Sequence, residues 1–508
     1  MDIQKEVNKR NKQVPSISKY FSTSADAGTI FDEITSNPSF QSESFSNPTN
    51  IFGQNVSSLN ESIMKTLNED NIHSPDLMMI PNVNANVIIE SDRRREAWPC
   101  NNDDTQLTLP GVTIQDDLSD PIEELVARHL GGENLQRNLL THADVTQDER
   151  GIRKLIEAKC YRAAINLTSR LLTVYGQGYG KLGQPAKHSP HSLQLWFTRI
   201  ALLAKIGLFS VCKTEADAFG LLERRDIFFQ HYSGLYENKV GSMASFSFRL
   251  LLAELPSHWQ KPKESLDRLY KILAVIRKIL QNLNNNLNEY GAATPVLSNE
   301  DREESIRLWT TREARTLHSV INSALMLKNY SLATQILTRL TKSTCWGAAH
   351  RCALHSVYGR VLLQLGDILG AEKQFSISRL LKRDPDAPDL REMIDKGLVA
   401  VAQNSLQEAF IIFQKALSLD PTNIMVLNNM GVVLLYSGKV KEAIALLEKA
   451  INTNPVRGLN ENLLINLCTL YELESSHSKT KKISLLRQIN NLNFDMTGPV
   501  HMCLKLPV

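Results

Sequence analysis

The chain has 508 residues, of which 42% are hydrophobic and 22% charged, so it contains enough apolar residues for a substantial core. Its formal net charge of +3 is close to balance, which gives no electrostatic reason to expect a nucleic acid or a membrane surface as partner. Its seven cysteines are scattered without a Cys-x-x-Cys pair, as expected in a reducing compartment. We expect a cytoplasmic protein, because we find neither a secretory signal nor an apolar stretch long enough to span a membrane.

Residues 1–118 are rich in Ser, Asn, Asp and Pro, and their apolar residues occur singly, without a helical or strand period. Such a segment buries too little apolar surface to offset its ordering entropy, so we predict a disordered tail. Two islands in it have the composition of short docking motifs: Phe-Asp-Glu-Ile at 31–34, and three arginines followed by Glu-Ala-Trp-Pro at 93–99. We interpret such islands as solvated charge runs in the tail, with a short peptide ligand as the alternative.

Helical periodicity begins near Pro121 and continues almost to the end. Within it, several residues recur at an offset of 34. The pairs are Gly397 and Gly431, Ala409 and Ala443, Phe413 and Leu447, Ala416 and Ala450, and Pro421 and Pro455. Small residues at a fixed spacing allow two helices to cross closely, and the prolines end one hairpin before the next. The pattern resembles the tetratricopeptide repeat, a helix-turn-helix unit of this period.

The predicted fold is therefore all-α, a right-handed superhelical solenoid of tetratricopeptide-type helical hairpins with a disordered N-terminal tail. We divide it into a divergent helical-hairpin half at 119–300, an array at 301–474, and a capping helix with a tail at 475–508. The best repeats are 390–421 and 424–455, and weaker copies extend upstream toward residue 145, for six to eight hairpins in total. A generic helical bundle is the alternative.

No catalytic, cofactor or metal site follows from the residues. Cys345, His350, Cys352 and His355 lie in one predicted helical run, and a single helix does not wrap four ligands around a tetrahedral ion. The glycine-rich residues 175–183 lack the spacing and the preceding strand of a phosphate-binding loop, so we predict a helix connector there. We therefore expect a protein that is not an enzyme and has no cofactor.

A solenoid of this type binds partners in its concave groove or along its edges. In the two best repeats, the groove-facing positions of the first helices are mostly apolar, which suits a partner helix or the face of another subunit. These candidate partner-binding residues are Arg391, Ile394, Leu398, Val401, Ala402, Met425, Asn428, Val432, Leu435 and Tyr436.

Several segments, taken in order, are similar to the family of subunit 12 of the transport (trafficking) protein particle complex, TRAPP. The specific ones are Gly-Gln-Gly-Tyr-Gly-Lys at 176–181 and Tyr-Glu-Leu-Glu-Ser-Ser at 471–476, and the resemblance covers roughly 120–508. It implies a scaffold subunit of a vesicle-tethering complex, in endoplasmic-reticulum-to-Golgi transport and autophagy. The implied partners are other TRAPP subunits, especially the large peripheral ones, and Rab GTPases indirectly. The implied location is the cytoplasm, peripheral to the intermediate compartment and the Golgi.

The alternative function is a co-chaperone adaptor that binds acidic C-terminal peptides. Such adaptors use a lysine and an asparagine at set groove positions to hold the terminal carboxylate. The matching positions here are Asn428 and Val432 in one repeat and Ile394 and Leu398 in the other, which does not support this recognition.

Overall fold

The structure is a computed structural model that describes residues 90–100, 106–131, 137–237, 239–293, 299–343, 346–382, 387–474, 477–496 and 500–506. Throughout these ranges the regular structure is helical, and β-pairing is limited to the isolated bridges Val112–Tyr179 and Phe228–Ser242. A search of the described helices finds none with the length and apolar character needed to cross a membrane. The all-α class is therefore confirmed for the described part of the chain.

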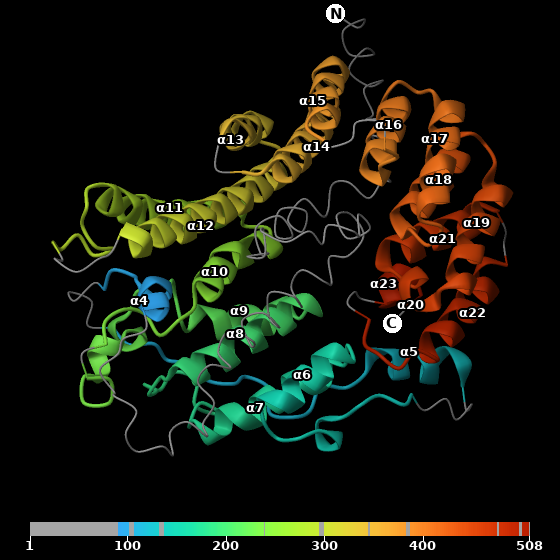
Figure 1. Cartoon of the computed structure of the whole chain (residues 1–508). Coiled ribbons are helices and arrows are strands. Elements are labelled where there is room, and N and C mark those ends of the chain that lie inside the picture. Colours follow the sequence, from blue (N-terminus) through green and yellow to red (C-terminus); the bar gives the residue numbers. More distant parts are fainter. Residues whose placement is uncertain are drawn as a thin grey trace, which may run out of the picture.

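Most helices pair into consecutive antiparallel hairpins that follow a curved path from α6 to α22 (Figure 1). The pairs are α6 (Glu149–Glu157) with α7 (Tyr161–Val174), α8 (Pro190–Lys205) with α9 (Phe209–Asp217), α10 (Phe246–His258) with α11 (Pro262–Asn284), α12 (Asn299–Met326) with α13 (Tyr330–Lys342), α14 (Ala348–Leu365) with α15 (Ile368–Leu380), α16 (Leu390–Ala402) with α17 (Leu406–Leu419), α18 (Ile424–Tyr436) with α19 (Val440–Thr453), and α21 (Glu461–Glu474) with α22 (Ser478–Asn490). The predicted solenoid of helical hairpins is confirmed.

Shorter helices complete the described part. They are α4 (Glu90–Glu96), α5 (Pro121–Leu130), α20 (Pro455–Gly458), α23 (Val500–Leu504) and the 3-10 turns His142–Asp144, Arg225–Ile227 and Phe229–Tyr232.

Seven of the hairpins, from α6–α7 to α18–α19, are closed by the same kind of turn. Each turn contains one residue with a left-handed backbone: Lys159, Gly207, Gln260, Lys328, Gly366, Asn404 or Gly438. The residue that follows it donates its N–H to the carbonyl five residues earlier, as Lys439 does to Leu434 at 2.9 Å. This bond satisfies a carbonyl that the end of the first helix leaves free. The same turn conformation therefore joins the two helices of hairpins whose sequences differ widely.

Glycines set the crossing distance in the three hairpins from α14 to α19. A Cβ atom added to Gly397 would lie 2.4 Å from the ring of Phe413, and one added to Gly431 would lie 2.9 Å from Leu447. Gly359 is equally close to Phe375. The repeat pattern predicts small residues where two helices cross closely, and Gly397 and Gly431 lie at such crossings.

Gly397→Ala is expected to destabilise the array by about 1–3 kcal/mol, because the added methyl group displaces the buried Phe413 ring. Urea unfolding followed by circular dichroism measures the change. Gly347→Ala is the matched control, because a Cβ there meets no atom within 4 Å. Phe413→Leu, combined with Gly397→Ala, should recover part of the loss, and equal stability of Gly397→Ala and the parent would contradict this crossing.

The first and last parts of the array meet. Helix α5 packs on α22 and α23, and the loop 491–496 contacts the turn between α6 and α7. The N–H of Asp495 donates to the carbonyl of Lys159 at 3.0 Å, and its carboxylate accepts from the N–H of Arg162 at 2.8 Å. The solenoid is therefore closed end to end instead of ending in two free hairpins.

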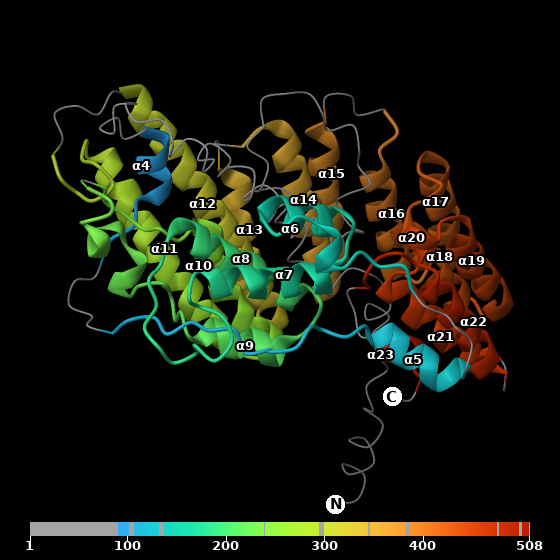
Figure 2. The same ribbon diagram turned by 90° about the horizontal axis from the view of Figure 1, so that it is seen from below.

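Residues 93–100 and 106–118, here called the N-terminal strap, lie against the helices, although the sequence predicts a disordered tail there. Trp98 is buried, with its ring centroid 6.4 Å from that of Trp309 and the Arg249 guanidinium 4.5 Å from it. Arg93 forms an ion pair with Glu289. In Figure 2 the blue trace of residues 106–118 runs past α9 to α5.

The tail prediction is therefore wrong for the strap, and so is the solvated charge run proposed for 93–99. The reason is that the strap's apolar and charged residues find their partners more than a hundred residues away, in α12 and in the loop after α11. The island at 31–34 lies outside the described residues.

Candidate interaction surface

The groove residues predicted in α16 and α18 are mostly buried within the chain itself. Ile394, Leu398, Val401, Met425, Asn428 and Val432 are each less than 9% exposed. Arg391, Ala402 and Leu435 lie outside the buried set, and Tyr436 is 37% exposed. The apolar members of the buried set belong to the same core cluster as residues of α6–α12. Among the predicted groove residues, Ala402 and Tyr436 are therefore exposed, and Arg391 and Leu435 are half-buried.

Asn428, which the adaptor alternative would need as a ligand for a carboxylate, is already bonded. Its side-chain oxygen accepts from the Nδ2 group of Asn466 in α21 at 2.8 Å. Nothing in this contact favours recognition of a peptide terminus.

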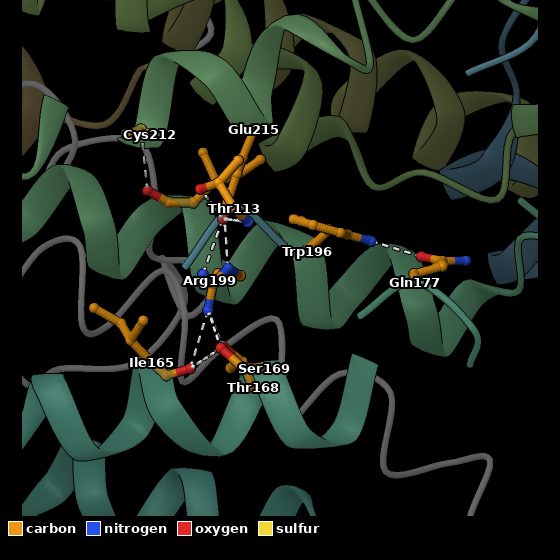
Figure 3. A network of polar contacts seen from close by, with 10 residues as sticks. Thr113, Ile165, Thr168, Ser169, Gln177, Trp196, Arg199, Cys212 and Glu215 are labelled. Atoms are coloured by element: carbon orange, nitrogen blue, oxygen red, sulfur yellow. Dashed lines mark hydrogen bonds and ion pairs between the residues drawn. The ribbon is translucent and has the colours of Figure 1, made fainter. Parts of the chain in front are cut away.

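A fully buried ion pair lies between α8 and α9, shown in Figure 3. Arg199 donates from Nε to Glu215 at 2.7 Å and from Nη2 at 2.9 Å, and both side chains have no exposed surface. Its Nη1 group donates to the carbonyl of Ile165 at 3.1 Å and to Ser169 at 2.7 Å. The arginine thus joins α7, α8 and α9, and its charge is matched inside the core.

Two buried carboxylates hold the N-terminal strap. Glu215 accepts both the N–H and the hydroxyl of Thr113, at 3.0 and 2.9 Å. Asp226 accepts both groups of Thr108, at 2.8 and 2.5 Å, and the Thr108 hydroxyl also contacts Nε2 of His188 at 2.5 Å. Asp226, His188 and Thr108 form a structural network, because all three side chains are buried and together they hold the strap against the helices. The sequence gives no signal for it, since His188 and Asp226 lie 80 and 118 residues after Thr108.

Two buried histidines make stability depend on pH. Burial lowers the pKa of His188 from its ordinary 6.5 to about 4, against the opposing attraction of Asp226, and burial lowers that of His318 to about 3. In the unfolded chain each histidine takes up a proton as the pH falls below about 6.5, whereas in the folded chain it stays neutral. Their contribution to stability is therefore complete above about pH 6.5 and is lost as the pH falls toward 4.

We expect the free energy of unfolding to fall by about 2 kcal/mol per histidine between pH 7 and pH 5. Urea unfolding at several pH values measures this fall. A His318→Gln variant should show a shallower pH dependence than the parent, and a flat profile for the parent would contradict the buried neutral histidines.

The glycine-rich loop after α7 has a structural role. Gln177 is buried, accepts the indole N–H of Trp196 at 2.6 Å, and donates to the carbonyl of Lys187 at 2.8 Å. The loop also pairs with the strap, since the N–H of Val112 donates to the carbonyl of Gln177 at 3.3 Å. It follows a helix and pairs with an extended segment, as expected of a connector, and it is not built as a phosphate cradle.

The residues considered for a metal are used elsewhere. Cys352 contacts the carbonyl of Ser378 at 3.1 Å, and His355 bonds Gln374 at 2.8 Å, while His350 lies beside Trp346. Cys345 lies outside the described residues. A search of the described residues finds no group of three or more potential ligands that would hold a metal ion.

A cleft of about 440 Å³ lies among α15, α16 and α17. Its charged residues bind one another: Lys382 pairs with Glu392 and with Asp389, and Lys396 pairs with Glu392. These mutual pairs occupy the charged groups of Lys382, Asp389, Glu392 and Lys396.

Two curated proteins named trafficking protein particle complex subunit 12 align with most of the chain. The mouse protein is 37% identical over 439 residues, which cover 82% of this chain and 54% of the mouse protein. The human protein is 38% identical over 407 residues, which cover 80% of this chain and 55% of the human protein. This chain is similar to subunit 12 over about four-fifths of its length. The resemblance predicted from the sequence segments is thereby confirmed, and the chain spans about half the length of these relatives.

Two further comparisons concern the helical array. A family model described as coatomer epsilon subunit matches residues 397–494, from α16 to the loop after α22. A solved structure, titled crystal structure of APC/C hetero-tetramer Cut9-Hcn1, covers 68% of this chain and 79% of its own, at 12% identity and a TM-score of 0.22. That score is too low to support an argument.

Proposed function

We propose that this chain is a non-enzymatic scaffold subunit of a TRAPP-type vesicle-tethering complex. The observation that carries the proposal is the similarity to subunit 12 over about four-fifths of the chain. The buried chemistry supports a scaffold, because the reactive groups most suited to catalysis, such as His188 and Asp226, are enclosed and bonded to the strap. Endoplasmic-reticulum-to-Golgi transport and autophagy are the proposed settings.

The proposed partners are other TRAPP subunits, especially the large peripheral ones, with Rab GTPases reached indirectly through the complex. The proposed location is the cytoplasmic side of the intermediate compartment and the Golgi. Because six groove residues are buried, we place the subunit contact on the exposed margin of the array, which includes Leu435 and Tyr436. A closed solenoid holds this margin in a fixed geometry, which favours a permanent contact between subunits.

Affinity purification of the tagged chain, followed by mass spectrometry, tests the proposal. Stoichiometric recovery of TRAPP subunits is the expected result, and their absence would refute it. A double substitution of Leu435→Glu and Tyr436→Glu should reduce the recovered subunits without unfolding the array. Leu369→Glu, at a residue that is 80% exposed elsewhere, is the control. Val401, another predicted groove residue, is not substituted in this test, because its side chain is buried.

A further inference from the structure

The last residue of α7 and the loop that follows it, residues 174–187, here together called the loop, expose apolar side chains that the array does not use. Val174 is 83% exposed, Tyr179 55%, Tyr175 42% and Leu182 40%. Isolated exposed apolar residues are normal on a soluble surface, whereas four within nine positions indicate a contact site.

The backbone of this loop is held from the inside. Buried Gln177 bonds Trp196 and the carbonyl of Lys187, as described above. On the strap side, the N–H of Gly183 donates to the carbonyl of Leu109 at 3.1 Å. A loop fixed in this way presents its exposed side chains with little further ordering entropy to lose on binding.

The loop is also locally basic, although the whole chain is near charge balance. Lys181 and Lys187 are exposed, and residues 174–187 include no acidic residue. Glu149, whose charge acts on Tyr175, contacts His191 at 3.1 Å. The loop therefore suits a partner that is anionic and accepts apolar side chains.

We propose that residues 174–187 form a membrane-contact loop that docks on an anionic lipid surface. Lysine is depleted from protein–protein interfaces, whereas lysine and tyrosine both suit the boundary between lipid headgroups and acyl chains. The tyrosine rings and Leu182 insert at that boundary, and the lysine ammonium groups stay with the headgroup phosphates. Two lysines give a weak attachment that anionic headgroups strengthen.

Co-sedimentation of the full chain with vesicles tests this proposal without any other subunit, so its outcome is independent of the proposed function. The vesicles contain either phosphatidylcholine alone or phosphatidylcholine with phosphatidylserine. We expect several-fold more sedimented chain with phosphatidylserine. Tyr179→Ser with Leu182→Ser should abolish the difference, and Lys181→Glu with Lys187→Glu should reverse it.

Leu235→Ser with Leu369→Ser is the matched control, because both residues are highly exposed elsewhere on the chain, at 74% and 80%. This control should sediment like the parent. Thermal unfolding checks that each variant folds. A parent that stays in the supernatant with both vesicles would overturn the proposal, and so would loop variants that sediment as strongly as the parent.

Discussion

Replacing Arg199 by methionine is expected to lower the free energy of unfolding by about 3–5 kcal/mol. The substitution leaves Glu215 as a buried negative charge that keeps only the donors of Thr113. It also leaves the carbonyl of Ile165 without its arginine partner. Denaturant unfolding measures the total loss. Hydrogen exchange should locate it in α7, α8 and α9, because a solenoid can open locally before it unfolds as a whole.

Two further variants separate the buried charge from a general packing defect. Adding Glu215→Gln to Arg199→Met should recover part of the loss, because a neutral amide still accepts from Thr113 without leaving an uncompensated charge. Arg339→Met removes a partner of Glu313 at a surface where the arginine is 59% exposed, and should cost less than about 1 kcal/mol. Equal effects of Arg199→Met and Arg339→Met would contradict the assigned role of the buried pair.

The part of the fold that the sequence predicts well is the part with a local period. Gly397 contacts Phe413, and Gly431 contacts Leu447, sixteen residues later in each case, so the hairpin contact repeats within one window of sequence. Upstream, insertions break the period, and the turn residues give no common signal. Lys159, Gln260 and Asn404 adopt the same left-handed backbone as the turn glycines, and composition does not mark them.

The strap and the burial of the groove could not be predicted, because both depend on contacts between distant parts of the chain. Thr113 looks like an ordinary polar residue in a Ser- and Asn-rich region until Glu215 is placed beside it, 102 residues away. The groove prediction assumes an open superhelix. In the structure the array closes on itself, and positions such as Ile394 and Val432 enter the core.

Arg137→Ala is expected to separate the two ends of the array, with a loss of about 3 kcal/mol. The Arg137 side chain is fully buried and pairs with Asp120 just before α5. Its Nη2 group donates to the carbonyls of Leu492 and Phe494, at 2.9 and 2.7 Å, in the loop after α22. One side chain thus links residues more than 350 positions apart, and nothing smaller reaches both carbonyls and the carboxylate.

Hydrogen exchange distinguishes an opened ring from a weakened core. The variant should exchange faster in α5, α22 and residues 491–496, while α11–α15 keep the protection of the parent. Arg170→Ala is the control, because Arg170 pairs with Asp117 at 3.5 Å and both side chains are more than half exposed. If α5 and α22 stay protected in Arg137→Ala, the contacts of Asp495 with Lys159 and Arg162 and the packing of α5 on α22 hold the closure without Arg137. Adding Arg162→Ala and Asp495→Ala should then increase exchange in these segments, since both bonds from Arg162 to the Asp495 carboxylate are lost.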